Sequence, residues 1–382
     1  MQVGARQAGS AISSSSWRAG RGLPRPVDRS AALVIAFRVV VVAAQAATLW
    51  ITWPLWTVHA SPPMLPALPL PALDLGWLLL VCLGLVLATP RFGLGLYTAV
   101  LAYAVLIDQT RLQPEVVSLT FLMWGTLSSH TAKTLARAHL VALWVFSGLN
   151  KLFSPDFMDG MSQWLLSGLM PSPPSWLNER AGYVIAVPEL SVGLLALYPR
   201  TRRFAAVAAC ALHIGIFLDL SPVGHDWNAA VWPWNLALAV AGFALIAPWV
   251  GSPLSALGRC PPLVRPLVAL LVVSPLGFYV GVTDAYVAHN LYSANTARAT
   301  VRCVGECRPE QQPTFTWEAF DVPLPPEHRL FEQHFERTCE PGDRLTIRDS
   351  RWWYRVRDLD HRTLTCPASG VGHRGRPAAA TT

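Results

Sequence analysis

Apolar residues in this chain fall in nine long and nearly uncharged runs. A helix rises about 1.5 Å per residue and needs about 20 residues to cross a bilayer, so the shorter runs must borrow flanking residues, tilt, or remain re-entrant. The run at 116–127 is the least secure. The pattern predicts an all-α polytopic membrane bundle of about nine spans. The runs are 33–55, 75–88, 92–107, 116–127, 140–153, 183–198, 204–218, 229–250 and 267–282.

After residue 287 the pattern changes to short stretches separated by turn residues. Residues 314–317, 345–347 and 352–356 combine β-branched, aromatic and alternating residues, which are typical of strands. We therefore expect a small β-rich module over 288–370. The last residues, 371–382, contain mainly Gly, Arg, Ala and Thr and are expected to be disordered.

Composition and charge agree with a membrane location. The chain is 52% hydrophobic and 14% charged, with a net charge of +7. The basic residues alternate between loops: a basic arm at 1–30 is followed by basic residues in every second loop of the bundle, residues 31–287. The positive-inside rule then predicts a multi-pass cell-membrane protein with a disordered cytoplasmic arm and an extracytoplasmic C-terminal module. The arginines lie beside spans, not along one soluble face, so no nucleic-acid partner is expected.

Four of the seven cysteines lie in the expected extracytoplasmic module. An even number in an oxidising compartment favours two disulfides, with three possible pairings. A zinc site is the alternative, but this spacing lacks a second close pair or a neighbouring histidine. We expect no metal. The four are Cys303, Cys307, Cys339 and Cys366.

A connecting segment at 154–180 contains an apolar stretch, 161–170, that is too short to span a bilayer. Four of its residues fall roughly on one side of a helix: Trp164, Leu165, Leu169 and Met170. The segment suits an interfacial helix lying on the outer leaflet, and a loop helix that only caps the bundle is an equal alternative.

Ionisable residues within apolar runs are candidate site residues by default. Lys151 lies near the outer end of its run, where a lysine either extends to the headgroups or, when partly desolvated, acts as a general base. Glu189 and His213 lie at similar depth in adjacent runs. They are expected either to form a proton-relaying pair or to satisfy each other structurally.

Two further groups border the outer ends of the runs. Asp108, Arg111 and Gln113 form a dense polar cluster that is either a solvated loop or the lining of an outward-facing site. Trp232 and Trp234 suit an interfacial aromatic belt, or the walls of a cofactor pocket for a ring-bearing lipid such as a quinone.

No nucleotide-binding loop, dinucleotide fingerprint or hydrolase elbow is present in the sequence. Residues 146–160, FSGLNKLFSPDFMDG, resemble a segment of the vitamin K-dependent gamma-carboxylases and of the related proteins with a horizontally transferred transmembrane (HTTM) domain. Residues 108–114, 189–193 and 211–213 resemble further segments of that family in the same order.

This resemblance implies a base, Lys151, that deprotonates a reduced quinone similar to vitamin K, with His213 as a site histidine. We expect Glu189 and His213 to tune the protonation of this base. The first functional hypothesis is therefore a carboxylase-like membrane enzyme. The alternative is a non-catalytic maturation or assembly factor for a secreted peptide or protein. The lipid bilayer is a partner in both.

Overall fold

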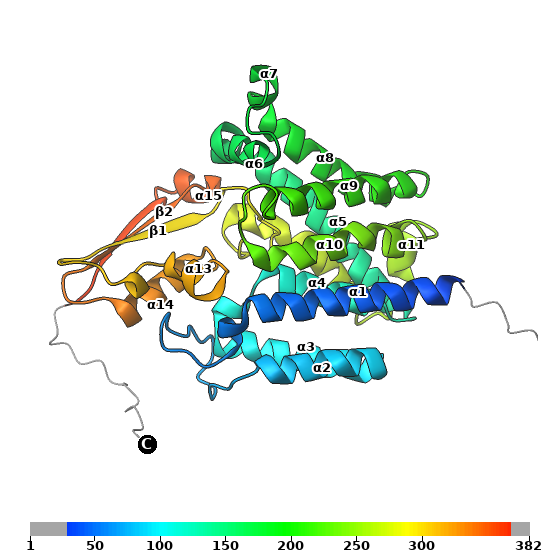
Figure 1. The fold of residues 1–382 in the computed structure, drawn as a ribbon, viewed down its shortest axis with the longest axis horizontal. Helices are drawn as coiled ribbons and strands as arrows, with labels where there is room; N and C mark the ends of the chain where they lie inside the picture. Colours follow the sequence, from blue (N-terminus) through cyan, green and yellow to red (C-terminus); the bar gives the residue numbers. More distant parts are fainter. Residues whose placement is uncertain (1–28, 368–382) are drawn as a thin grey trace, which may run out of the picture.

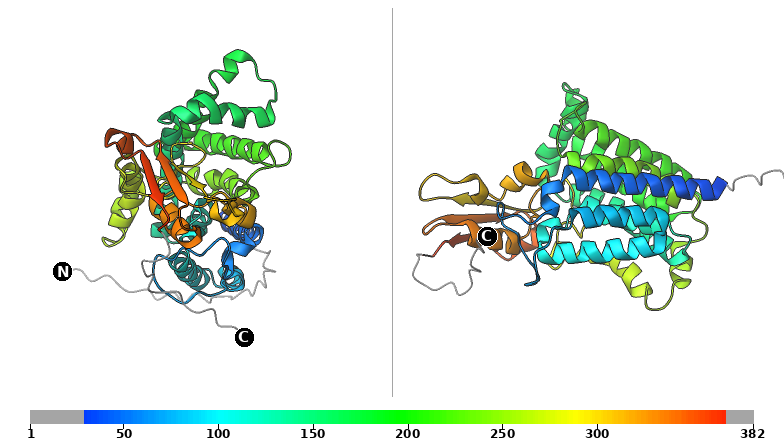
Figure 2. Two further views of the ribbon diagram at one scale, coloured as in Figure 1. Left: turned by 90° about the vertical axis from the view of Figure 1, so that its left-hand side faces the viewer. Right: turned by 60° about the horizontal axis from the view of Figure 1, so that its bottom comes forward.

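The computed structural model describes residues 29–367, so the predicted arm and most of the predicted disordered tail lie outside the described residues. Helices lie side by side to form a bundle, and a small sheet with short helices sits at one end of it (Figure 1). The right-hand view of Figure 2 shows the same arrangement, with the sheet beyond the helix ends. We call this end of the bundle the module end.

All nine apolar runs form helices in whole or in large part. The bundle consists of α1 (Arg29–Ile51), α2 (Gly76–Ala88), α3 (Pro90–Ile107), α4 (Pro114–Gly125), α5 (His130–Leu152), α8 (Ala181–Leu197), α9 (Arg202–Leu220), α10 (Trp232–Ala241) and α12 (Arg265–Val273). Shorter helices connect them: α6 (Ser162–Leu169), α7 (Ser175–Asn178) and α11 (Pro253–Gly258).

Four helical segments of the described chain are long and apolar enough to cross a membrane. They are Ala32–Ile51, Pro90–Ile107, Arg202–Leu220 and Ala229–Ile246, and three shorter apolar helices lie beside them. The expected count of about nine spans is not confirmed. Helix α4 is short for a span, with only 12 residues. Helix α5 has 23 residues, but several of its side chains are polar or charged.

Two glycines bring α5 and α8 into close contact. A Cβ atom at Gly148 would lie 2.6 Å from the backbone nitrogen of Leu190, and one at Gly193 would lie 2.8 Å from the backbone nitrogen of Val145. Small residues at such crossings let helix backbones approach closely. The close crossing sets the candidate site residues of α5 and α8 opposite each other.

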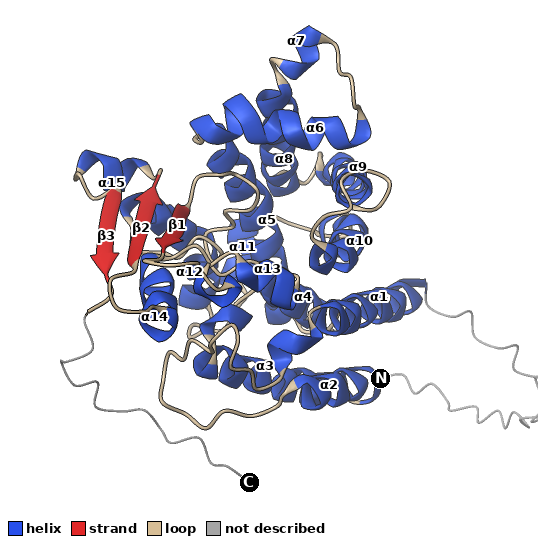
Figure 3. Ribbon diagram, turned by 60° about the vertical axis from the view of Figure 1, so that its left-hand side comes forward, coloured by secondary structure: helices blue, strands red, loops and turns tan. Residues whose placement is uncertain are grey.

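The C-terminal module, residues 297–366, contains an antiparallel sheet in the order β1-β2-β3 (Figure 3). The strands are β1 (Ala297–Arg302), β2 (Arg344–Asp349) and β3 (His361–Thr365), and Ala297 pairs with Asp349. Leu345 and Ile347 alternate with more exposed neighbours and are fully buried, as expected for a strand with one face on a core.

The prediction of a β-rich module is only partly correct. The expected strand at 345–347 is present within β2, but 314–317 contributes to helix α13 (Phe315–Phe320) and 352–356 forms α15 (Trp352–Val356). Aromatic and β-branched residues favour strands only where a pairing partner is available. Helix α14 (His328–Thr338) instead covers the sheet, with Leu330, Phe331 and Phe335 in its core.

Two disulfides staple the module, as predicted, and the structure selects one of the three pairings. Cys303 pairs with Cys307, and Cys339 pairs with Cys366. The second bond joins the residue after α14 to the residue after β3.

Specific polar contacts hold the module on the bundle. Arg329 Nη1 lies 2.7 Å from Asp284 Oδ1, and Glu327 Oε1 accepts a 2.7 Å hydrogen bond from the backbone N–H of Ala285. Gln113 Nε2 donates to the carbonyl of Pro323 at 3.1 Å. These contacts join the module to the start of α4 and to the segment that follows α12.

Candidate functional site

An apolar pocket of about 280 Å³ lies within the bundle near the module end. Its walls come from α5, α8, α9 and α10, and α6 contributes Leu165, Leu166 and Leu169. Most of the lining is aliphatic, and a few polar side chains converge on it. Such a combination is typical of binding pockets for small apolar molecules.

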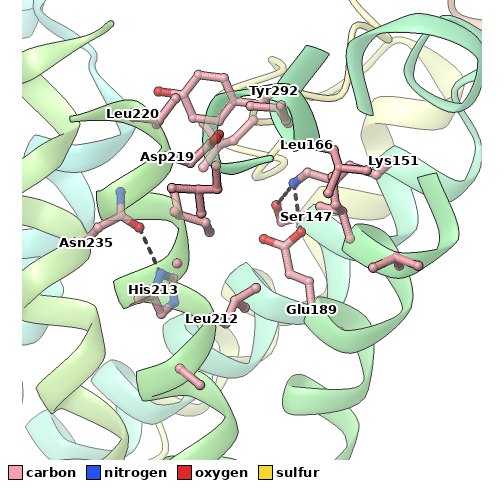
Figure 4. A pocket seen from close by; sticks show the side chains of 18 of the residues that line it. Ser147, Lys151, Leu166, Glu189, Leu212, His213, Asp219, Leu220, Asn235 and Tyr292 are labelled. Atoms are coloured by element: carbon pink, nitrogen blue, oxygen red, sulfur yellow. Dashed lines mark hydrogen bonds and ion pairs between the residues drawn. The ribbon is translucent and has the colours of Figure 1, made fainter. Parts of the chain in front are cut away.

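Lys151 and Glu189 form a buried ion pair in this pocket (Figure 4). Lys151 Nζ lies 2.7 Å from Glu189 Oε2 and also donates a 2.7 Å hydrogen bond to Ser147 Oγ. Their side chains are 6% and 7% exposed. Charges removed from water require this kind of pairing and hydrogen bonding. One interpretation of the sequence expected Lys151 to extend to the lipid headgroups. The buried ion pair shows that it does not.

His213 faces the same pocket but is not paired with Glu189. Its Nδ1 lies 2.9 Å from Asn235 Oδ1, and its Nε2 accepts a 2.9 Å hydrogen bond from Trp144 Nε1. Because an indole N–H can only donate, Nε2 carries no proton and Nδ1–H donates to Asn235. The expected pair of Glu189 and His213 is therefore absent. Glu189 pairs with Lys151 instead, and both ring nitrogens of His213 are occupied by Asn235 and Trp144.

Three polar residues of the pocket were missed from the sequence: Ser147, Asp219 and Asn235. Ser147 stands four residues before Lys151 on α5, a spacing that places both on one helix face. Asp219 is 8% exposed at the end of α9, and its Oδ1 lacks a hydrogen-bond partner in the described part of the chain. Helical spacing could have found Ser147, but the other two are brought in by neighbouring helices.

The predicted segment at 161–170 folds as the eight-residue α6 after a π-helical turn, Phe157–Met161. Helix α6 packs against α8 and α9 and closes the pocket from one side. Its placement at the membrane surface remains a prediction.

Asp108, Arg111 and Gln113 lie at the module end but outside this pocket. Asp108 accepts hydrogen bonds from His59 and from the backbone N–H of Leu65, both at 3.1 Å. Arg111 donates to the backbone carbonyls of residues 55 and 57. These contacts tie loops together, while Gln113 lines a second cavity. A cofactor-binding role for them remains a prediction.

The two tryptophans differ in their placement. Trp234 is 4% exposed and lines the pocket, whereas Trp232 donates its indole N–H to the carbonyl of Leu220 at 3.0 Å and is not among the pocket residues. Within residues 29–367, no group of three or more His, Cys, Asp or Glu side chains could hold a metal ion.

The long apolar helices indicate a multi-pass integral membrane protein. Over residues 129–220 the chain is similar to a family described as methylamine utilisation protein MauE, which is a membrane protein family. That range runs from the start of α5 to the end of α9. No significant match exists among curated proteins or solved structures.

The family match corrects the resemblance drawn from the sequence. The segment around Lys151, which was read as similar to the gamma-carboxylases and the HTTM-domain proteins, falls inside the stretch that matches MauE. The prediction that this chain is related to those proteins is therefore wrong. A short segment around one lysine is too brief to identify a membrane family, because short motifs often match by chance.

Proposed function

We propose that this protein is a membrane maturation or assembly factor for an extracytoplasmic peptide or protein, and that its bundle pocket binds a lipid-soluble molecule. One observation carries the proposal. Sixteen of the twenty residues that line the pocket belong to the segment similar to MauE. The family's character as a maturation-type membrane factor supports this function for the present chain.

The shape and chemistry of the pocket support a lipid-soluble occupant. Its walls are mainly Leu, Ile, Val and Ala side chains, which favour apolar molecules. The ion pair of Lys151 and Glu189 and the carboxyl group of Asp219 supply hydrogen-bonding groups at separate points. A membrane lipid and a quinone-type cofactor both combine an apolar body with a polar head, and lipid analysis distinguishes them.

Gly215 of α9 offers a direct test of occupancy. It lines the pocket, and a Cβ atom at this position would meet no atom within 4 Å, so Gly215→Phe would put a ring into open space. Gly95 of α3 is also unobstructed but does not line the pocket. Gly95→Phe is therefore a matched control.

The experiment is mass spectrometry of molecules that copurify with the full-length protein in detergent. The wild-type protein and Gly95→Phe should retain one species above its abundance in the bulk lipid, and Gly215→Phe should lose it. Equal retention by both variants, or no enriched species with the wild type, would overturn the pocket assignment.

The maturation role is tested in the cell that encodes the protein. Depletion should leave at least one extracytoplasmic protein unprocessed or unassembled, and the wild-type gene should restore it. An unchanged extracytoplasmic proteome after depletion would contradict the role.

A second candidate function is removal of a proton from a bound, reduced quinone-type ligand, favoured by the hydrogen-bonded Lys151 in an apolar pocket. A general base must be unprotonated before it can accept a proton from the ligand, a state that lysine can reach but arginine cannot. Lys151→Ala and Lys151→Arg should then both abolish function. Restoration by the arginine variant would assign Lys151 a structural role.

A further inference from the structure

A second cavity, of about 220 Å³, lies between the bundle and the C-terminal module. The bundle side contributes Glu115 and Trp227, and the module contributes Trp317. Trp234 and Tyr292 line both this cavity and the pocket described above, so the two spaces are neighbours with a common wall.

Glu115 is the single charged residue among those that line this cavity. It is 2% exposed, and its Oε1 has no hydrogen-bond partner in residues 29–367. No ion pair with Glu115 occurs within those residues either. A first-turn position on α4 favours a carboxylate through the helix dipole but supplies no counter-ion. Burial of such a group is costly unless it is paired.

A second acceptor and two aromatic walls accompany the carboxylate. Asn228 Oδ1 also lacks a partner in the described chain, while its amide nitrogen donates to the hydroxyl of Tyr292 at 2.5 Å. The ring centroids of Trp227 and Trp317 are 5.2 Å apart. Unused acceptors select a ligand with N–H donors, and tryptophan faces attract cations.

The backbone around the cavity is held in an unusual conformation. Asn228, Tyr292 and Ala294 all line it, and their φ angles are 52°, 51° and 57°. Asparagine adopts this left-handed region readily, but tyrosine and alanine do so at a cost of about 1–3 kcal/mol. Strained residues of this kind gather at ligand sites, where surrounding contacts hold them.

We propose that this second cavity binds a small organic cation, a primary ammonium or guanidinium group, with Glu115 as its counter-ion and Trp227 and Trp317 beside it. No Lys, Arg or His side chain lines the cavity to compete for the carboxylate. The same group occurs on free amines and on the side chains of a peptide, so both sources fit the chemistry. This site goes beyond the proposed function and does not depend on it.

The test is a saturation-transfer NMR titration of n-butylammonium against the full-length protein in deuterated detergent. We expect saturable binding that n-butanol does not displace, because the neutral alcohol lacks the charge. Glu115→Gln keeps the size of the side chain and should weaken binding at least about tenfold. Glu318→Gln on the exposed side of α13 is the matched control and should bind as the wild type does.

A second arm uses the peptide acetyl-Ala-Lys-Ala-amide as the competitor. If the peptide displaces bound n-butylammonium at a concentration below the dissociation constant of n-butylammonium, the natural source is a peptide side chain. If the peptide is needed at a higher concentration than that, the source is a free amine. Equal displacement by n-butanol, unchanged binding by Glu115→Gln, or no saturable binding would overturn the proposal. The n-butanol comparison uses the wild-type protein alone, so it decides even if Glu115→Gln fails to fold.

Discussion

The ammonium group of Lys151 lies 2.7 Å from the carboxylate of Glu189, which joins α5 to α8 inside the apolar pocket. The residues are 38 positions apart in the chain. Removal of one partner from a buried ion pair leaves the other charge without compensation, which costs more than the pair itself contributes.

Lys151→Ala should therefore destabilise the bundle by about 3–5 kcal/mol. The double variant Lys151→Met/Glu189→Leu should recover most of that loss, because it removes both charges and keeps apolar volume. Thermal unfolding in detergent measures all variants. Lys133→Ala is the matched control, since Lys133 lies on the same helix and has no carboxylate partner in the described residues. A double variant less stable than Lys151→Ala would refute the pairing argument.

The module end is expected to face the extracytoplasmic side, since disulfides form in oxidising compartments and basic residues favour the opposite side. Leu359 in the module and Leu263 between α11 and α12 are 52% and 93% exposed. In intact cells an impermeant maleimide should label Leu359→Cys, and it should label Leu263→Cys only after permeabilisation. The reverse pattern would invert the topology.

The stability of the module should fall as pH decreases from about 6.5 to about 4. Burial lowers the pKa of His334 to about 4, while backbone groups of Glu310 and Gln311 partly oppose the shift. The unfolded chain then binds more protons than the folded chain between these pH values, so acid favours unfolding by up to roughly 3 kcal/mol.

Hydrogen exchange of peptides covering α14, corrected for the intrinsic pH dependence, measures this effect. His334→Phe should remove most of the dependence. His361→Gln should leave it unchanged, because His361 is exposed. Identical pH profiles for the wild type and His334→Phe would exclude His334 as the cause.

The two disulfides should contribute unequally. Cys339 and Cys366 are 27 residues apart, whereas Cys303 and Cys307 are four apart. Loop-closure entropy gives about 3.5 kcal/mol for the longer loop and about 2 kcal/mol for the shorter one. Paired Cys→Ala variants, compared by chemical unfolding of the module, should follow this order. A greater loss from the Cys303–Cys307 pair would show that strain or local packing outweighs chain entropy.

The helical membrane bundle could be predicted from hydrophobic run lengths, because the bilayer fixes how many apolar residues a helix needs. The same reasoning identified Lys151, Glu189 and His213, since ionisable groups in apolar runs are rare enough to stand out. Cysteine number and placement predicted two disulfides but left their pairing open.

The strands of the module were harder to predict, since propensity cannot distinguish a short helix from a strand without its neighbours. Residues 352–356 look β-like in isolation, yet no strand is available to pair with them, and they form α15. The family could not be predicted from the sequence, because a short motif around one lysine carries a high risk of a false match.

The sequence by itself determined that the chain enters a membrane, which residues carry charge within apolar runs, and that the module is stapled by disulfides. Tertiary structure alone decided the partners of those residues. Lys151 meets Glu189 because two glycines let α5 and α8 approach, and His213 is occupied by Trp144 and Asn235 from neighbouring helices. Run length and composition are local properties of the chain, whereas side-chain pairing depends on how distant helices pack.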